Sequence, residues 1–483
     1  MNVAVLGASG YVGSHLVPAL VAAGHHVRAA SRRPEFLEAR GWHGVEIVGA
    51  DALDRSSLSP LLKQCDAAYY LVHSMAAGEG FAERDKQAAR NFVEAAEHEG
   101  VGRIVYLGGL KPEGGASRHL ASRLETGDVL RSGNVPITEL RAGIIVGPGS
   151  AGFEVIRDLV NHLPVMVTPR WVSSRTQPIA LQTLISYLLG VLDHPQTGGH
   201  TFDVGGSEVL SYRELMSQYA EVAGKRVRMI PVPVLTPRLS SWWLDLVTAV
   251  PGSVARPLIE GLRSELIVRD NDAIRQWIDP PLMTYRESIV DAIEEERRGA
   301  LPSRWTEGAL AFRGYNTDVS FYSKGEQFSV SVNAPAAVTW QVVRSIGGAR
   351  GYYYADRLWQ IRGLIDRAVG GIGMRRGRRH PTDIRVGDAI DFWRVVAVET
   401  GRRLTLSAEM KLPGEASLEF EVIPDGDDGS TLSMQARFHP EGIPGLLYWY
   451  AMAPAHHFIF RRMPAAIARA AERRARHLSR DTG

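Results

Sequence analysis

The stretch that decides the fold is Gly7-Ala8-Ser9-Gly10-Tyr11-Val12-Gly13, which follows directly on the short apolar run Asn2-Val3-Ala4-Val5-Leu6. A helical pattern comes next, and a glycine-rich turn between a strand and a helix is the usual setting for binding the pyrophosphate of a dinucleotide. Gly7 permits the tight turn, Gly10 lets the backbone approach the phosphates, and Gly13 lets the helix pack closely on the strand. The N-terminus of the helix adds N–H groups and a partial positive charge. The stretch therefore predicts a dinucleotide-binding turn.

The chain downstream of this turn alternates apolar runs with amphipathic segments. Because strands alternate with helices of this length in βαβ units, the pattern predicts a parallel α/β sheet, a Rossmann domain, over residues 1–300. The expected strands are Asn2–Leu6, His26–Ala30, Val45–Val48, Ala67–Val72, Arg103–Leu107 and Ile137–Ile145, and the expected helices include Phe81–Glu99 and Leu120–Arg131.

Length and composition indicate an ordinary globular protein. The chain has 483 residues, 45% of them hydrophobic, and this length suggests two or three domains. Its net charge of +2 argues neither for nor against an anionic partner. The single cysteine, Cys65, fits a reducing compartment, and the N-terminus lacks the pattern of a signal peptide. The most apolar stretch, Ile443–Phe460, contains two prolines and two histidines and predicts no spanning helix. We expect a cytoplasmic protein, with peripheral contact at the inner face of the membrane left open.

The spacing of the turn is G-x-x-G-x-x-G, and this variant resembles the extended and atypical short-chain dehydrogenase/reductase superfamily. The resemblance covers about residues 1–300 and includes the segments at the ends of the third to sixth expected strands. It implies NAD(P) binding by these segments and by the turn. The implied cofactor-binding residues are Gly7, Ser9, Gly10, Tyr11, Val12, Gly13, Asp51, Ala52, Val72, His73, Ser74, Gly108, Gly109, Arg123, Ala142, Gly143 and Ile144.

The end of the second expected strand indicates which cofactor is bound. NAD-binding domains carry an acidic residue there for the ribose 2′-hydroxyl. Here the segment reads Ser31-Arg32-Arg33, and a hydroxyl with two guanidinium groups suits a 2′-phosphate. NADP(H) is therefore favoured over NAD(H), although a solvated loop is the alternative interpretation. Asp51 is expected near the adenine or as a turn residue.

The resemblance also defines a catalytic set that this sequence lacks. Reductases of this type carry a Ser at the end of the fifth strand and a Tyr with a Lys four residues later. Here the strand ends in Gly108-Gly109, and the helix carries His119 and Arg123 at the Tyr and Lys spacing. One helical turn places both on one face, so His119 is a candidate general acid and Arg123 a candidate ribose ligand. Ordinary polar helix residues are the alternative.

The last part of the chain has a different pattern. After a linker at residues 301–325, residues 326–483 show a strand, Asn-Ala-Pro, a helix over Ala336–Val343, a section rich in Gly, Arg and aromatic residues, several strands including Ala389–Thr400, and an apolar helix over 445–471. This predicts an α+β domain with an antiparallel sheet and a long C-terminal helix. It resembles the START-like (SRPBCC, helix-grip) superfamily, which implies an apolar cavity between sheet and helix.

These patterns leave more than one function open. The first hypothesis is an NADP(H)-dependent oxidoreductase acting on a hydrophobic, quinone-, lipid- or polyketide-like small molecule, with His119, His73 or water as proton donor. The second is a catalytically inactive NADP(H)-binding protein that carries lipid or senses redox state. A weaker third is a membrane-surface scaffold using the basic tail. The basic segment Arg375–His380 is expected to be a solvated loop, with binding of an anionic headgroup or phosphate as the alternative. No nucleic-acid motif, no metal-ligand set and no indication of oligomeric state is found.

Overall fold

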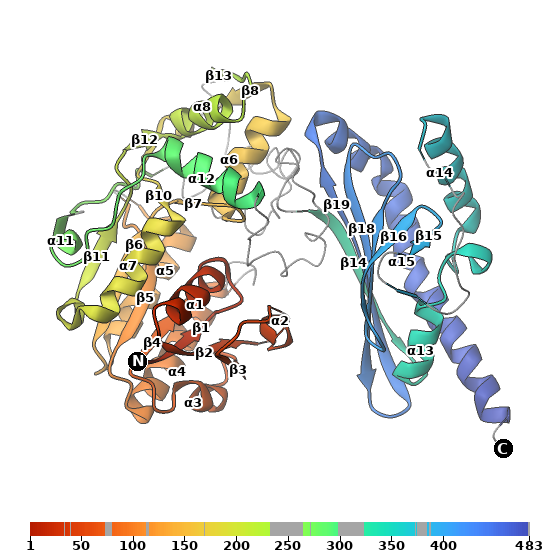
Figure 1. Cartoon of the computed structure of the whole chain (residues 1–483), viewed down its shortest axis with the longest axis horizontal. Helices are drawn as coiled ribbons and strands as arrows, with labels where there is room; N and C mark the ends of the chain where they lie inside the picture. Colours follow the sequence, from red (N-terminus) through yellow and green to blue (C-terminus); the bar gives the residue numbers. More distant parts are fainter. Residues whose placement is uncertain are drawn as a thin grey trace. The chain divides into compact units, whose positions relative to one another are not determined.

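The computed structural model describes residues 1–32, 34–38, 40–72, 80–112, 115–168, 170–231, 264–270, 272–297, 323–371, 373, 384–385 and 388–481. The chain divides into two compact units, Met1–Thr306 and Glu307–Gly483 (Figure 1). Several predictions fall outside the described residues. These are Arg33, His73 and Ser74 of the expected cofactor site, most of the expected linker 301–325, and the basic segment Arg375–His380.

A seven-stranded parallel sheet forms the centre of the first unit, in the order β11-β6-β5-β4-β1-β2-β3. Its strands are β1 (Asn2–Leu6), β2 (His26–Ser31), β3 (Val45–Gly49), β4 (Ala67–Tyr70), β5 (Ile104–Gly109), β6 (Ile137–Ala142) and β11 (Thr201–Val204). The central strands are buried on both faces, as expected for short apolar runs in a parallel sheet. The predicted Rossmann-type fold is confirmed.

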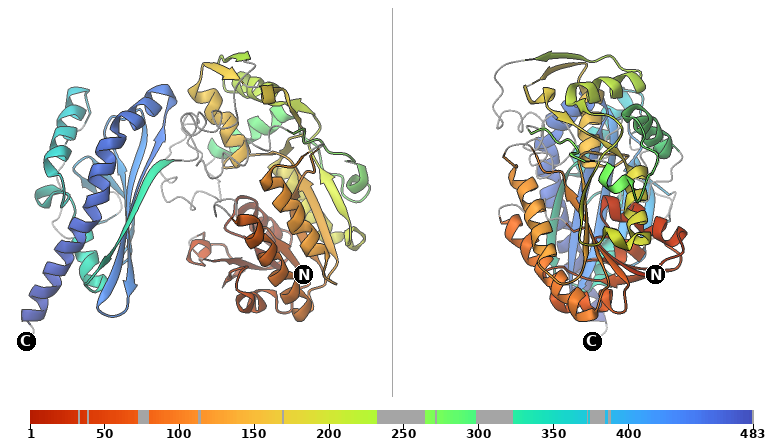
Figure 2. Two further views of the ribbon diagram at one scale, coloured as in Figure 1. Left: turned by 180° about the vertical axis from the view of Figure 1, so that it is seen from behind. Right: turned by 90° about the vertical axis from the view of Figure 1, so that its left-hand side faces the viewer.

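Helices cover both faces of this sheet (Figure 2). On one face α1 (Tyr11–Ala22) and α7 (Leu181–Asp193) bury apolar side chains such as Leu16 and Leu184 against the strands. On the other face α3 (Arg55–Leu62), α4 (Phe81–Glu99) and α5 (Arg118–Arg131) do the same with side chains such as Leu58 and Phe92. Helix α4 ends at Gly100, whose φ of +72° is the left-handed conformation that glycine adopts readily.

Shorter elements complete the first unit. The pairs β7 with β10 and β8 with β13 are parallel, and β9 with β12 is antiparallel. The elements are α2 (Glu35–Glu38), β7 (Ile145–Val146), α6 (Ala151–His162), β8 (Val165–Thr168), β9 (Arg175–Thr176), β10 (Ile179–Ala180), β12 (Leu210–Ser211), α8 (Tyr212–Val222), β13 (Arg228–Pro231), α11 (Asp272–Arg275) and α12 (Tyr285–Arg297).

The second unit is a six-stranded antiparallel sheet in the order β14-β19-β18-β17-β16-β15, with the long helix α15 packed on it (Figure 1). Its elements are β14 (Lys324–Val332), α13 (Ala336–Val343), α14 (Asp356–Ala368), β15 (Ala389–Ile390), β16 (Trp393–Glu399), β17 (Arg403–Ala408), β18 (Gly414–Asp425), β19 (Gly429–Pro440) and α15 (Gly442–Asp481). The predicted class of this part, an antiparallel sheet with a long C-terminal helix, is confirmed.

The second unit differs from the sequence prediction in three elements. The structure has a helix, α14, in the section rich in glycine, arginine and aromatic residues, and α15 extends past both predicted ends. The predicted strand Ala389–Thr400 is broken into β15 and β16, because Asp391 has a φ of +55°. Its carboxylate accepts hydrogen bonds from the Gly348 N–H at 3.0 Å and the Tyr352 hydroxyl at 2.9 Å, which holds the turn. Within the described residues, no helix is long and apolar enough to cross a membrane.

Candidate functional site

Close packing around the glycine turn requires its glycines. Gly7 has a φ of +93°, and a Cβ there would lie 2.9 Å from the carbonyl carbon of Leu71 on the neighbouring chain segment. A Cβ on Gly13 would lie 2.4 Å from the Gly7 carbonyl oxygen and 2.8 Å from the Ala8 Cα. Real Cβ atoms do not approach other heavy atoms so closely, so any side chain at Gly13 would push α1 away from β1. The turn has the geometry that a pyrophosphate site needs.

The N-terminus of α1 is suited to an anion. Its cap residue, Gly10, contributes no side-chain hydrogen bond, and its first turn contains no acidic residue. The first hydrogen bond into the helix runs from the Ser14 N–H to the Gly10 carbonyl at 2.9 Å. The N–H groups of Val12 and Gly13 precede that bond and so have no partner inside the helix. Together with the helix dipole they form a positive end for phosphate oxygens.

The second strand ends beside the glycine turn, at Ser31 and Arg32. Ser31 is buried at the end of β2, whereas Arg32 is exposed. Register places Ala30 opposite Leu6, so the next residue of each segment, Ser31 and Gly7, lies at the same edge of the sheet. This is the edge at which parallel sheets bind nucleotides.

Arg40 is a site residue that the sequence interpretation missed. Its Nη2 donates a hydrogen bond of 3.2 Å to the carbonyl oxygen of Ser9, inside the glycine turn, and its guanidinium lies 5.0 Å from the ring centre of Trp42. Among the described residues, its buried Nε and Nη1 have no hydrogen-bond partner. Burial lowers the pKa of Arg40 to about 10, which still leaves it charged at neutral pH. No motif marks this position, because Arg40 reaches the turn only through the fold.

Asp51 and Ala52 follow β3 at the same edge of the sheet. One carboxylate oxygen of Asp51 accepts a hydrogen bond of 3.0 Å from the Leu53 N–H, and its own N–H donates to the Ser57 hydroxyl at 2.9 Å. The carbonyl oxygen of Ala52 accepts a hydrogen bond from Asn91 at 2.9 Å. The structure therefore gives Asp51 a turn role, and that role leaves its second carboxylate oxygen for a ligand.

The space at the end of β5 explains why glycine replaces the expected serine. A Cβ on Gly109 would lie 3.2 Å from Leu120 Cδ2 and 3.5 Å from Arg123 Cδ. A Cβ on Gly108 would lie 2.7 Å from the carboxylate oxygen Oε1 of Glu139. Side chains from α5 and β6 occupy the positions into which a serine would extend. The absence of the serine is thus part of the packing of this chain.

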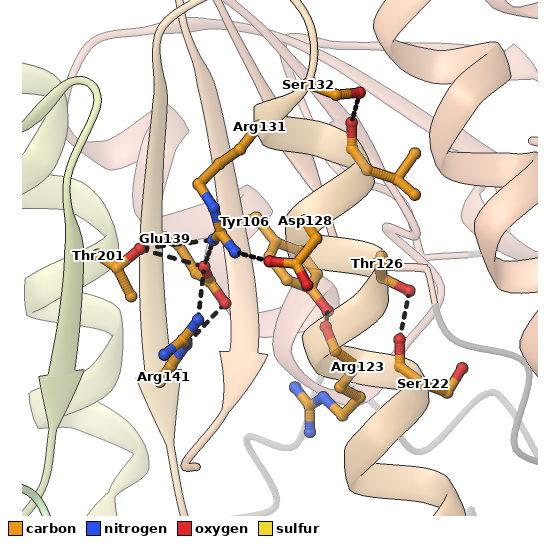
Figure 3. A network of polar contacts seen from close by, with 11 residues as sticks. Tyr106, Ser122, Arg123, Thr126, Asp128, Arg131, Ser132, Glu139, Arg141 and Thr201 are labelled. Carbon is orange, nitrogen blue, oxygen red and sulfur yellow. Dashed lines mark hydrogen bonds and ion pairs between the residues drawn. The ribbon is translucent and has the colours of Figure 1, made fainter.

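The two candidate catalytic residues lie on α5. His119 is 6% exposed and lies in the first turn of the helix, whose N-cap is Ser117. Arg123 lies one turn further, and its Nη2 donates a hydrogen bond of 2.9 Å to the Leu107 carbonyl oxygen. The Arg123 carbonyl oxygen accepts a hydrogen bond of 2.9 Å from the Tyr106 hydroxyl (Figure 3), and burial raises the pKa of Tyr106 to about 12. Arg123 is therefore fixed across the end of β5.

The segment that follows β6 forms a further part of the candidate site, next to a cluster of apolar side chains. Register pairs Ala142 with Gly109, so Ala142, Gly143 and Ile144 lie at the same sheet edge as the turn. A Cβ on Gly143 would lie 3.2 Å from Leu110 Cδ1. Val72, partly buried, follows β4 at this edge. A small apolar cluster adjoins these segments; it consists of Leu110, Leu120, Leu266 and Val268.

A buried carboxylate braces β6 against α5 (Figure 3). Glu139 is fully buried and accepts hydrogen bonds from Arg141 Nε at 2.9 Å, from the Thr201 hydroxyl at 3.2 Å, and from Arg131 at the end of α5. Arg131 also binds Asp128, which is mostly exposed. This network positions the helix that carries His119 and Arg123.

Comparison with known proteins identifies the class of the first unit. A family model described as NAD(P)H-binding matches residues 7–133, and a second, described as a protein of unknown function, matches residues 322–463. The chain is 26% identical over 233 residues to a ceramide reductase of Caulobacter vibrioides, covering 48% of this chain and 73% of that protein. It is also 26% identical over 294 residues to a 3-diazoavenalumate denitrifying reductase of a Streptomyces species, covering 52% of this chain and 91% of that protein.

Solved structures show the same fold. The triphenylmethane reductase of a Citrobacter species is 20% identical, with a TM-score of 0.51 over 61% of this chain and 100% of that one. An NADPH-dependent quinone oxidoreductase of Escherichia coli is 18% identical, with a TM-score of 0.50 over 60% of this chain and 99% of that one. The first unit is thus a Rossmann-like domain, and its residues 7–133 match an NAD(P)H-binding family. Its relatives by sequence include reductases.

Proposed function

We propose that the chain is an NADP(H)-dependent oxidoreductase acting on a hydrophobic carbonyl or quinone-like substrate. The observation that carries the cofactor preference is the pair Arg32 and Arg40 at the end of β2 and beside Ser9. Arg40 keeps two buried N–H positions without a partner among the described residues, and a buried donor without a partner is costly. A 2′-phosphate near Ser9 would satisfy these donors, which a ribose hydroxyl would do far less well.

The substrate class is supported by the residues at the other end of the site. Leu110, Leu120 and Leu266 form an apolar cluster, and Leu110 lies beside Gly143, in the segment that borders the nicotinamide in the families this chain resembles. When bound, the reduced nicotinamide supplies a hydride, which is a hydrogen with two electrons, to an electrophilic carbon. In the proposed reaction His119 gives a proton to the substrate oxygen, and Arg123 holds the ribose. The reductases among the relatives, one of which is named for ceramide, fit this class.

The test is direct titration of the full chain with NADPH and NADH, followed by NADPH oxidation with a panel of quinones, enones and aldehydes. We expect NADPH to bind at least tenfold more tightly than NADH and at least one panel compound to be reduced. Failure to bind either cofactor would sink the proposal.

A second candidate function is a catalytically inactive NADP(H)-binding protein with a lipid-binding or redox-sensing role. The observation that favours it is the close packing at Gly108 and Gly109, where an added side chain would press on Glu139 or Leu120, together with histidine and arginine at the Tyr and Lys positions. The two candidates make different predictions. The inactive protein would be favoured if NADPH binds tightly, no compound of the panel causes NADPH oxidation, and a His119→Gln variant binds NADPH with unchanged affinity.

A further inference from the structure

The second unit contains a cavity that the reductase proposal does not use. It has a volume of about 180 Å³ and lies between the sheet, α14 and the first half of α15. Its walls are apolar and rich in aromatic rings, and they include Trp359, Trp393, Phe438, Trp449 and Phe460. A cavity of roughly 150 Å³ with apolar walls can hold one benzene ring. The space is therefore enough for a small ring compound.

The rings around the cavity contact one another in a continuous series. Trp359 lies 6.2 Å from Phe460, Phe460 lies 5.4 Å from His456, and His456 lies 5.6 Å from Trp449, all between ring centres. Trp449 in turn stacks on Phe438 at 5.9 Å with an interplanar angle of 6°. Aromatic rings interact favourably with a further ring by stacking or edge contacts. This arrangement favours a flat ligand over a flexible chain.

Polar atoms in the cavity wall indicate what else the ligand carries. Trp359 is 6% exposed and lines the cavity. Across the described part of the chain, the Trp359 Nε1 has no hydrogen-bond partner, and neither has the Nδ1 of His456. The indole N–H can only donate. Buried donors in folded proteins nearly always find an acceptor, so the indole N–H points to an acceptor on a ligand.

The charge state of the wall restricts the ligand further. Burial, and then the positive charge of Arg362, lower the pKa of His456 to about 4, so its imidazole is neutral at physiological pH. The arginines in the wall lie beside polar groups: Arg362 is 5.7 Å from the ring centre of Tyr448, and Arg437 donates to Gln435 at 2.6 Å. Among the described residues that line this cavity, none carries a carboxylate. A cationic ligand would therefore be disfavoured.

We propose that this cavity binds a neutral one- or two-ring aromatic molecule with an oxygen atom that accepts a hydrogen bond from Trp359. Aromatic ketones, aldehydes and quinones have this chemistry. The inference goes beyond the proposed function, because it requires neither NADP(H) nor turnover in the first unit.

The test compares two probes of the same shape on the full chain. Acetophenone carries an acceptor oxygen on its ring substituent and ethylbenzene does not, and ligand-detected NMR titration measures the binding of each. We expect acetophenone to bind more tightly. Trp359→Phe should weaken acetophenone about three- to tenfold, the loss typical of one hydrogen bond, and leave ethylbenzene nearly unchanged.

Two further variants separate cavity binding from other effects. Ser433→Ala removes a serine of the same sheet whose hydroxyl is hydrogen-bonded to Ser329 and Gln327. It should therefore change the binding of neither probe. Ala455→Leu, or Ala416→Leu if the first does not fold, fills the cavity and should abolish binding of both probes. NADPH titration of every variant should match the unaltered chain, which distinguishes this inference from the reductase proposal. Absence of saturable binding, or binding that survives the cavity-filling change, would overturn it.

Discussion

Arg123 Nη2 donates a hydrogen bond of 2.9 Å to the carbonyl oxygen of Leu107, so the arginine lies across the carboxyl end of β5. The resemblance to short-chain reductases places a ribose-binding lysine at this position of the helix. A guanidinium has five N–H donors, so one bond to Leu107 leaves others for ribose hydroxyls. A lysine ammonium at the end of a flexible chain would not lie flat against Gly109 in the same way.

Arg123→Ala should weaken NADPH and NADH about equally, by roughly ten- to a hundredfold, because a charge-assisted hydrogen bond contributes about 1.5–3 kcal/mol. The ribose on the nicotinamide side is common to both cofactors, so no selectivity should change. Cofactor fluorescence titration measures both constants. Arg118→Ala, in the same helix, is the control, and an unchanged affinity in Arg123→Ala would remove this residue from the site.

Arg40→Leu and Arg32→Glu should each weaken NADPH far more than NADH. We expect a loss of about ten- to a hundredfold for NADPH, which corresponds to one charge-assisted contact with the 2′-phosphate, and less than threefold for NADH. Leucine at position 40 keeps apolar contact with Trp42, so the local fold has a replacement for the lost stacking. Equal losses for the two cofactors would contradict the preference for NADP(H).

The sequence predicted the main strands and helices of the first unit because the patterns that mark these elements are local. The strand Asn2–Leu6 and the helix Phe81–Glu99 were predicted with the bounds that the structure has, since an apolar run and a capped amphipathic segment identify themselves. Arg40 was missed because its role depends on a contact with Ser9, 31 residues earlier, that no spacing rule encodes. Site residues that follow strands can be predicted, whereas those brought in by a loop cannot.

In the second unit, two features could not be predicted from the sequence. Helix α14 was not predicted because it lies in the section rich in glycine, arginine and aromatic residues, which was not divided into elements from its sequence. Several of its apolar residues, such as Leu364 and Ile365, are more than half exposed. The broken strand at Asp391 was equally hidden, because its left-handed backbone is stabilised by Tyr352 and Gly348 from another part of the chain.

Gly13→Ala should abolish measurable binding of both cofactors and lower the stability of the first unit. The added methyl would lie 2.4 Å from the Gly7 carbonyl oxygen, and relief of that clash moves the helix N-terminus away from the phosphates. Gly115→Ala is a matched control, because a Cβ there meets no atom within 4 Å. Thermal unfolding and NADPH titration of both variants test the expectation. Normal binding by Gly13→Ala would show that the pyrophosphate does not approach this turn.

Glu139→Ala should destabilise the first unit by about 3–5 kcal/mol. Arg131 and Arg141 are largely buried and both pair with this carboxylate, so the substitution leaves two guanidinium groups without their shared partner. Asp128→Ala removes a mostly exposed partner of the same Arg131 and should cost less than about 1 kcal/mol. Urea unfolding followed by circular dichroism gives both values. Similar losses in the two variants would mean that burial of Glu139 does not determine its contribution.

Glu415→Gln should stabilise the second unit at pH 8 and have little effect at pH 4. Burial, and then the nearby charge of Glu441, raise the pKa of Glu415 to about 7 from an ordinary value of 4.5. Between these two values the unfolded chain loses a proton that the folded chain keeps, so this group makes stability fall as pH rises from about 4.5 to 7 and then level off. Glutamine has no proton to lose, and it removes that fall.

Because the side chain of Glu415 is only partly buried, we expect a gain of about 1–2 kcal/mol at pH 8, which corresponds to a few degrees in melting temperature. Differential scanning calorimetry of the full chain at pH 4 and pH 8 measures the difference between the variant and the unaltered protein. Glu441→Gln is the control, and it should give a smaller gain in the same direction because it removes only the second of the two causes. An equal shift at both pH values would show that folding does not raise the pKa of Glu415 and would contradict this prediction.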